Sequence, residues 1–184
     1  MSAATGATEA RVELVDADGR ATGTAPVTEA HLAPAARHRA FSVVLHDGAG
    51  RVLLQIRSSA KERWPGYLAN SCCGHPASEA TLIEDARTRV REELGITVET
   101  LTEVGRFEYQ AAMPDSRWEE WEYDHVLVGE ITPDTPIDPD PSEVSAFAWV
   151  AGRPDDGVPH APWLAPVIDA AADHVPGFRG SETP

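Results

Sequence analysis

The strongest constraint on the fold of this chain is a helical segment at residues 81–94. Thr81 and Glu84 have the spacing of a capping box, and Gly95 is the residue type that ends helices in a left-handed conformation. An apolar stripe at helical spacing runs through Leu82, Ile83, Ala86, Val90 and Leu94. The segment therefore predicts an amphipathic helix that packs its apolar side against a larger body.

Apolar runs on both sides of this helix predict strands. They cover residues 11–15, 40–45, 52–56, 104–109, 118–131 and 144–150. Turn residues at 47–50 separate two of these runs and indicate a hairpin, and a last helix is expected near Pro162. Strands before and after a helix favour a single α/β domain. We expect it at residues 11–178, between disordered tails at residues 1–10 and 179–184.

The charge balance and the cysteine content limit the partners and the compartment. With 30 acidic and 15 basic residues the formal net charge is −15, so the surface repels a polyanion and we expect no nucleic-acid partner. No apolar run approaches the roughly 20 residues of a membrane span, and the first residues do not resemble a signal peptide. Cys72 and Cys73 are adjacent and have no third cysteine to pair with, which favours a reducing compartment. We expect a cytoplasmic protein that is a monomer or a weak homodimer.

The segment from Gly74 to Ile96 resembles the Nudix box, whose pattern is G-x5-E-x7-R-E-U-x-E-E-x-G-U with U aliphatic. The matching residues are Gly74, Val90, Glu92, Glu93, Gly95 and Ile96. Ala80 replaces the first Glu of the pattern, and Thr88 and Arg89 replace its Arg-Glu pair. In Nudix hydrolases those carboxylates hold the divalent ions that activate water. The resemblance therefore implies a Nudix-like mixed β-sheet sandwich with flanking helices, without the hydrolytic chemistry.

Helical geometry places Glu93 and Arg89 on the side of the helix that faces the body, within roughly 40° of Leu82 and Ala86. An ionised Glu at such a position costs several kcal/mol unless a cation lies against it. Two hypotheses follow. Either Glu93 forms a structural salt bridge with Arg89, or Glu93 binds Mg2+ while Arg89 binds a phosphate oxygen.

A longer series of motifs runs through the chain. Its pieces are His31 and His38 seven residues apart, Arg57-x3-Lys61-x2-Trp64-Pro65-Gly66, Asn70-Ser71-x-Cys73-Gly74-His75-Pro76, Glu93-Leu94-Gly95, Phe107-x-Tyr109, Glu120-x-Glu122-x-Asp124-His125 and Pro162-Trp163. In this order and spacing they resemble the type I isopentenyl-diphosphate isomerases from about Val12 to Asp169. The element around Cys73 and the Glu-x-Glu pair are specific in combination, whereas any single histidine or the Pro-Trp pair would mean little.

The resemblance implies an enzyme of isoprenoid biosynthesis that interconverts isopentenyl diphosphate and dimethylallyl diphosphate. Moving the double bond requires an acid and a base on opposite faces of the substrate, and water has to be kept from the intermediate cation. By resemblance Cys73 and Glu122 form the acid–base pair, Tyr109 hydrogen-bonds the Glu122 carboxylate, and Trp163 presents its ring to the cation. A thiol suits this role because its reference pKa of about 8.5 lets it both give and take a proton.

Two metal ions are implied as well. The implied ligands of the first ion are His31, His38, His75, Glu120 and Glu122. Imidazoles combined with carboxylates suit Mn2+ or Zn2+, and on a strand Glu120 and Glu122 share a face about 7 Å apart. The second ion would be Mg2+, held by Glu93 and the substrate diphosphate. The implied clamp for the phosphates consists of Arg57, Lys61 and Arg89.

Three alternatives remain open from the sequence. A Nudix hydrolase of a diphosphate substrate would need a Glu where this chain has Arg89. A paralogue that acts on a modified prenyl diphosphate would resemble this chain closely. Leu68-Ala69 replaces the family's usual Trp-Thr and Ala80 is also unusual, and we expect both changes near the pocket wall. A non-catalytic metal-binding domain would have no use for the acid–base pair together with a Trp that faces a cation.

Overall fold

A computed structural model describes residues 9–154 and 157–178 of the chain. Its elements are β1 (Arg11–Val15), β2 (Ala21–Pro26), α1 (Val27–Ala30), β3 (His38–His46), β4 (Arg51–Arg57), β5 (Leu68–Ala69), β6 (Cys72–Gly74), η1 (Glu79–Thr81), α2 (Leu82–Leu94), β7 (Thr102–Ala112), β8 (Glu119–Glu130), β9 (Val144–Ala151), α3 (Leu164–Ala171) and η2 (Ala172–His174). All predicted strands and both predicted helices are thereby confirmed. The predicted tails lie outside the described residues, apart from Glu9 and Ala10. No helix in the described ranges has the length and apolarity needed to cross a membrane.

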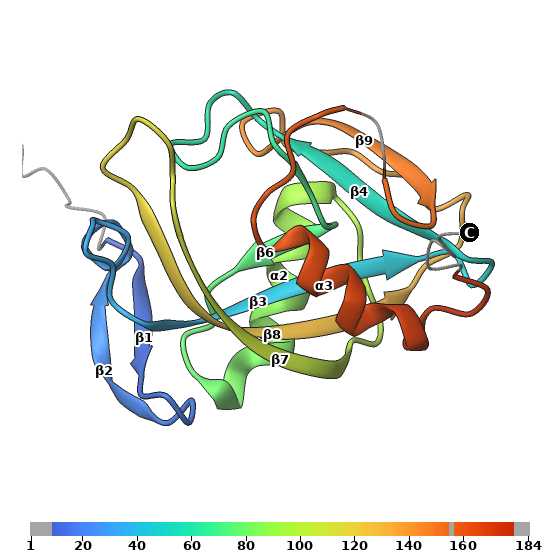
Figure 1. Cartoon of the computed structure of the whole chain (residues 1–184). Coiled ribbons are helices and arrows are strands. Elements are labelled where there is room, and N and C mark those ends of the chain that lie inside the picture. Colours follow the sequence, from blue (N-terminus) through green and yellow to red (C-terminus); the bar gives the residue numbers. More distant parts are fainter. Residues whose placement is uncertain (1–8, 155–156, 179–184) are drawn as a thin grey trace, which may run out of the picture.

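The strands form one mixed sheet in which β3 is the central strand (Figure 1). β3 runs parallel to β8 along its full length, and the register pairs His38 with Glu122 at one end and His46 with Glu130 at the other. β6 pairs antiparallel with the middle of β3, while β7 extends the sheet beyond β8 and β9 pairs with β4. The chain therefore brings the His38 and Glu122 side chains together through strand register.

The hairpin predicted around residues 47–50 exists only at its turn. β3 and β4 pair at His46 and Val52 and then diverge, and β4 continues along β9. The reason lies in the pairing of β3. A strand has two edges, and β8 and β6 occupy those of β3, so β4 has to find its hydrogen-bonding partner elsewhere.

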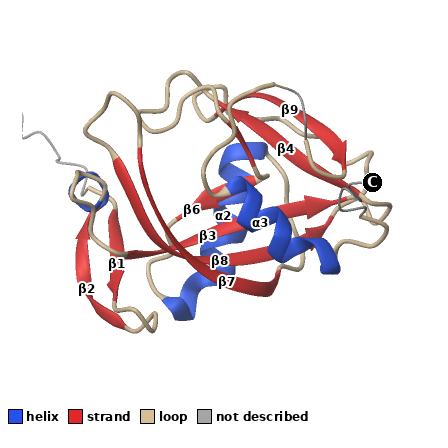
Figure 2. Ribbon diagram, viewed as in Figure 1, coloured by secondary structure: helices blue, strands red, loops and turns tan. Residues whose placement is uncertain are grey.

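Helices cover both faces of the sheet (Figure 2). All nine residues of β3 are buried, and alternate side chains of a strand point to opposite faces. Phe41 and Val43 belong to the apolar cluster that includes α2, whereas Val44 belongs to the cluster that includes α3. In Figure 1 α3 lies in front of the sheet and α2 behind it. This arrangement confirms the predicted α/β sandwich.

The start of α2 differs from the prediction, and its end agrees with it. Thr81 does not cap α2, because its hydroxyl group bonds to the backbone of Ser78 and to Asp85, and the capping box forms one turn earlier between Ser78 and Thr81. Gly95 ends the helix with φ 68°, as predicted. A Cβ atom at Gly95 would lie 2.8 Å from the carbonyl oxygen of Asp138, so glycine also permits the loop before β9 to approach the helix end.

Candidate active site

A cavity of about 510 Å³ brings together most of the predicted site residues. Those that line it are His31, Arg57, Lys61, Cys73, His75, Arg89, Tyr109, Glu120, Glu122 and Trp163. His38 and Glu93 are buried behind the lining and contact it through Glu122 and Arg89. A cavity of this size suits a small ligand.

Three of the residues that depart from the family patterns do not line this cavity, whereas Thr88 and Arg89 do. We expected Leu68, Ala69 and Ala80 near the pocket wall, and among the described residues none of the three lines it. Leu68 and Ala69 are buried in the apolar cluster that includes α3, and Ala80 is exposed on η1. None of the three therefore forms the wall itself, although Leu68 and Ala69 share their apolar cluster with Cys73, Tyr109 and Trp163, which do line the cavity.

The predicted histidines and Glu122 converge at one end of the cavity. His31 follows α1, His38 begins β3 and His75 follows β6, while Glu122 comes from β8. The four residues offer ligand atoms that all lie within 4.8 Å of one another. We call these residues together with Glu120 the His/Glu cluster. Four separate segments thus supply side chains to one point, as metal sites require.

Backbone carbonyl groups orient two of the rings. Nδ1 of His31 lies 2.7 Å from the carbonyl oxygen of Val27, and Nδ1 of His38 lies 2.8 Å from that of Ala36. Each Nδ1 therefore donates its proton away from the cluster, and Nε2 of the neutral ring directs its lone pair into it. Metal-ligating histidines are usually held in this way.

Buried acceptor atoms face one another inside the cluster. Nε2 of His31 lies 3.0 Å from Oε2 of Glu120, and Nε2 of His38 lies 3.5 Å from Oε1 of Glu122. While the rings are neutral, both Nε2 atoms and Oε2 of Glu120 are buried without a hydrogen-bond partner in the described part of the chain; a proton on Nε2 of His31 would satisfy that atom and Oε2 of Glu120. An unsatisfied buried acceptor costs about 1–3 kcal/mol, and a divalent cation would satisfy all three at once. The residues present therefore fit a metal ion.

The carboxylates and the burial set the charge of the cluster. Burial lowers the pKa of His31, but hydrogen bonds to Glu120 and Glu122 outweigh it and raise this pKa to about 9. For His75 burial dominates and lowers the pKa to about 3. Burial acts to raise the pKa of Glu122, but hydrogen bonds from the three histidines hold it well below its usual range. Glu122 is thus a carboxylate, and the Tyr109 hydroxyl group donates to it at 2.7 Å, as predicted.

Cys73 reaches the cavity from β6. Its Sγ donates to Oδ1 of Asn70 at 3.1 Å and lies 3.7 Å from the hydroxyl oxygen of Ser42. Burial, followed by the negative charge of Asp124, raises the pKa of the Cys73 thiol to about 12. Cys73 is therefore a protonated thiol at neutral pH. Cys72, its neighbour, is fully buried in the apolar cluster that includes α2.

The amide of Asn70 joins the thiol to Trp163. Its Oδ1 also accepts from Nε1 of Trp163 at 3.1 Å, and its Nδ2 donates to the carbonyl oxygens of Val43 and Cys72. These bonds fix which end of the amide faces Cys73 and Trp163. The Trp163 ring lies 6.0 Å from the Tyr109 ring between centroids. The presentation of this ring to a substrate cation stays a prediction.

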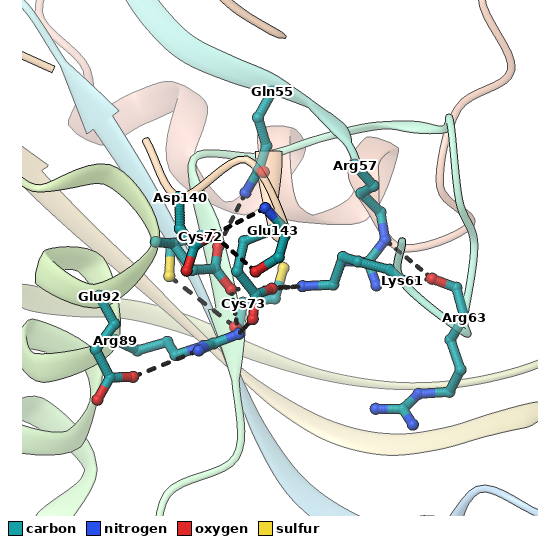
Figure 3. Close-up of polar contacts among 12 residues, drawn as sticks. Gln55, Arg57, Lys61, Arg63, Cys72, Cys73, Arg89, Glu92, Asp140 and Glu143 are labelled. Atoms are coloured by element: carbon teal, nitrogen blue, oxygen red, sulfur yellow. Dashed lines mark hydrogen bonds and ion pairs between the residues drawn. The ribbon is translucent and has the colours of Figure 1, made fainter. Parts of the chain in front are cut away.

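A second group of charged residues lies beside the cavity, and its signs alternate. Oε1 of Glu93 lies 2.8 Å from Nη2 of Arg89 and 3.7 Å from Nζ of Lys61. Glu143 contacts the same two cations, with Oε1 2.8 Å from Nη2 of Arg89 and Oε2 against Nζ of Lys61 (Figure 3). We call these four residues the charge ring. The predicted salt bridge between Glu93 and Arg89 is confirmed, and the binding of Mg2+ and phosphate stays a prediction.

Arg57 differs from the other two predicted clamp residues. Its Nε and Nη2 donate to the carbonyl oxygens of Arg63 and Trp64, at distances from 2.9 to 3.3 Å (Figure 3). Its Cζ also lies 5.4 Å from the centre of the Trp163 ring. Arg57 therefore holds the loop that follows β4, and its contact with a phosphate stays a prediction.

Several residues of this site had no role in the sequence analysis. Asn70 and Asp124 lay within recognised motifs, so the motifs could have drawn attention to them. Glu143 lies in a Pro- and Asp-rich loop without periodicity, and no sequence signal distinguishes it from its acidic neighbours. Its position depends on how that loop packs against α2.

Comparison with known proteins agrees with the fold and with the motifs. The model of the NUDIX domain family matches residues 36–165. A protein from Nocardia farcinica described as isopentenyl-diphosphate Delta-isomerase is 49% identical, over 87% of this chain and 93% of its own length. A protein from Streptomyces griseus with the same description is 40% identical, over 97% of this chain and 92% of its own length.

Solved structures give the same architecture. A protein from Deinococcus radiodurans has a TM-score of 0.66 at 19% identity, over 87% of this chain and 98% of its own. A MutT Nudix hydrolase from Burkholderia pseudomallei has a TM-score of 0.56 at 19% identity, over 73% of this chain and 97% of its own. At such identities the likeness shows the fold alone, and it confirms the predicted Nudix-like fold.

Proposed function

Because this chain belongs to the isopentenyl-diphosphate Delta-isomerase family and has the Nudix fold, we propose that it interconverts isopentenyl diphosphate and dimethylallyl diphosphate. The observation that carries the proposal is the pairing of a protonated thiol, Cys73, with an ionised carboxylate, Glu122, on the lining of one cavity. Lys61 and Arg89 line the same cavity and supply positive charge for the diphosphate.

The reaction is a balanced exchange of protons. One proton is added to the terminal CH2 carbon of the alkene, and one is removed from the carbon next to the resulting tertiary cation. Cys73 and Glu122 between them hold one proton to give and one vacant site to receive a proton. Tyr109 holds the Glu122 carboxylate in place through its hydrogen bond. Trp163 and Tyr109 form an aromatic wall that excludes water and favours a cation.

The His/Glu cluster would hold the first metal ion, for which Mn2+ or Zn2+ suits the donor set. When bound, this ion supplies positive charge beside Glu122 and so lowers the basicity of its carboxylate. Mg2+ would enter with the substrate diphosphate and share Glu93, because Mg2+ in proteins commonly keeps phosphate oxygens and water among its ligands. Lys61, Arg89 and Arg57 would then orient the diphosphate.

The direct test is incubation of the metal-loaded protein with isopentenyl diphosphate and Mg2+ in deuterated water. Proton NMR follows the formation of dimethylallyl diphosphate and the uptake of deuterium. We expect turnover and exchange in the wild type and neither in Cys73→Ala or Glu122→Gln. A folded, metal-loaded wild type that shows no isomerisation and no exchange would refute the proposal.

Two further outcomes of the same experiment separate the alternatives. Release of inorganic phosphate or pyrophosphate would indicate a hydrolase, although Arg89 in place of the motif carboxylate opposes that function. Turnover of a modified prenyl diphosphate, without turnover of isopentenyl diphosphate, would indicate a paralogue. The departures at Leu68 and Ala69 do not favour it, because these residues lie in the core.

A further inference from the structure

Glu143 is the member of the charge ring that no motif includes. Its side chain is 22% exposed, and its two carboxylate oxygens contact two of the cations that line the cavity, Lys61 and Arg89. Glu143 does not itself line the cavity, in the part of the chain that the structure describes. It therefore acts on a bound anion through Lys61 and Arg89.

The backbone around Glu143 connects the two elements that carry these cations. The amide of Ser58, in the loop that carries Lys61, donates to the carbonyl oxygen of Glu143 at 2.9 Å. The amide of Asp140 donates to the carbonyl oxygen of Glu93 at the end of α2, also at 2.9 Å. Hydrogen bonds at both ends of this loop thus fix Glu143 between Lys61 and Arg89.

Burial and contact keep the carboxylate ionised. Burial acts to raise the pKa of Glu143, but hydrogen bonds from Lys61 and Arg89 outweigh it and lower the pKa. The charge ring then contains two cations and two carboxylates, and its formal charge is zero. A neutral ring adds little attraction for a metal-free diphosphate beyond that of Arg57, because a carboxylate lies beside each of its two cations and repels the added negative charge. A diphosphate that carries Mg2+ brings its own positive charge to the carboxylates.

We propose that Glu143 determines the form in which the diphosphate binds: it makes the charge ring accept the Mg2+ complex and discriminate against the metal-free anion. The inference rests on the proposed function, which places the diphosphate at Lys61 and Arg89. Glu93 alone would leave the ring with one excess positive charge, and that ring would hold a metal-free diphosphate well. The second carboxylate removes this excess.

The test uses inorganic pyrophosphate as the probe and needs no turnover. Isothermal titration calorimetry of the zinc-loaded, desalted protein gives its Kd with and without Mg2+, for the wild type and Glu143→Gln. Removing the negative charge of Glu143 beside Lys61 and Arg89 should lower the Kd of metal-free pyrophosphate about ten-fold. The Kd of the Mg2+ complex should stay the same or rise. The ratio of the Kd of metal-free pyrophosphate to the Kd of its Mg2+ complex should therefore fall at least about ten-fold.

Two variants control the experiment. Glu84→Gln removes an equal charge from the same helix as Arg89, at a residue that contacts Arg87 at 3.6 Å; its side chain is 74% exposed and does not line the cavity, so solvent screens it and the ratio should stay within about two-fold of wild type. Glu143→Asp keeps the charge and should keep most of the discrimination. Glu143→Ala, which also removes the charge, takes the place of Glu143→Gln if thermal melting shows that Glu143→Gln does not fold.

Two results would overturn the inference. If both Kd values weaken together in Glu143→Gln, the residue only holds Lys61 and Arg89 in place. If wild type binds the two forms of pyrophosphate equally, the charge ring does not discriminate. Neither result bears on isomerisation, which the NMR experiment measures separately.

Discussion

The His/Glu cluster and the charge ring, the two charged regions at the cavity, differ in how their charges are balanced. In the His/Glu cluster acceptor atoms converge, and His31 Nε2 and Glu120 Oε2 are satisfied only when a proton or a metal ion lies between them. In the charge ring every carboxylate already contacts a cation, and Arg89 contacts both Glu93 and Glu143. The His/Glu cluster therefore needs a bound cation to satisfy its acceptor atoms, whereas the charge ring balances its charges without a ligand.

This difference predicts how the stability of each region depends on its ligand. The residues of the cluster fit a resident metal ion, so removal of that ion should affect both folding and chemistry. The charge ring is held by its own ion pairs, so it should keep its structure without a ligand. When a diphosphate binds, Lys61 and Arg89 should replace some of their contacts with Glu93 and Glu143 by contacts with the phosphates. The four predictions below test this contrast, from the largest expected effect to the smallest.

Substitution of Glu122 should have the largest effect, because this residue belongs to the His/Glu cluster and, in the proposed function, to the acid–base pair. We expect Glu122→Gln to lower kcat at least about 10³-fold, as loss of an acid–base group commonly does. It should also lower the metal content measured by atomic absorption. Glu130→Gln, at the exposed far end of β8, provides the control and should retain both. Full metal content in Glu122→Gln would show that the cluster does not need this ligand.

The pH dependence of stability should reveal the proton on His31. Its pKa is raised from 6.5 to about 9 in the folded protein, so the metal-free protein has the full stabilisation below pH 6.5 and loses it as the pH rises through 9. The loss should be at most about 3 kcal/mol in the free energy of unfolding, measured with urea in EDTA. Metal-loaded protein should not show this loss, because the ion replaces the proton on Nε2.

The control for this prediction is His31→Gln. The cysteine thiols also titrate at alkaline pH, and they contribute to the slope of both proteins. Only the part of the slope that disappears in the variant belongs to His31. Equal slopes in the two metal-free proteins would show that His31 is not protonated in the cluster.

Removal of Arg89 should act mainly on substrate binding, because the proposed function places the diphosphate, and not the alkene, at the charge ring. We expect Arg89→Ala to raise KM about 10- to 100-fold with a smaller change in kcat, the range for a lost charged hydrogen bond. Arg89→Lys should recover part of this loss. A fall in kcat at unchanged KM would instead place Arg89 in the chemical step.

A change at Gly95 should have the smallest effect and should reach only the charge ring. Ala at φ 68° is strained, and its Cβ would lie 2.8 Å from the Asp138 carbonyl oxygen, so we expect Gly95→Ala to cost about 1–2 kcal/mol in a urea titration. Gly157→Ala is the matched control, because Gly157 has φ 72° but open space around a Cβ. An equal cost in both variants would mean that backbone strain alone is responsible. A larger cost at Gly95, with unchanged metal content, would locate the damage at the loop that carries Glu143.

The fold was predictable where the signal is local or periodic. The apolar stripe and Gly95 identify α2, but the cap at Ser78 was missed because the Thr81 hydroxyl group can bond in more than one way. The sequence predicted the turn between β3 and β4, but it did not predict that the two strands diverge after the turn. It depends on the pairing of β3 with β8, which lies far along the chain.

The candidate site was predictable to the extent that its residues lie in motifs. The contact between Tyr109 and Glu122 and the salt bridge between Glu93 and Arg89 were both expected and are both present. The orientation of His31 was not predictable, because it depends on the carbonyl group of Val27, which any residue could supply. Glu143 was missed for a similar reason, since its role comes from the packing of a loop.

The central strand also limits how the length of the chain can change. An inserted or deleted residue in β3 would exchange its two buried faces and put Arg39 where His38 meets Glu122. Both apolar clusters and the His/Glu cluster would be lost in one step. Changes of length among proteins of this architecture should therefore fall in the connecting loops, and β3 offers a fixed reference from which an alignment of distant relatives can be anchored.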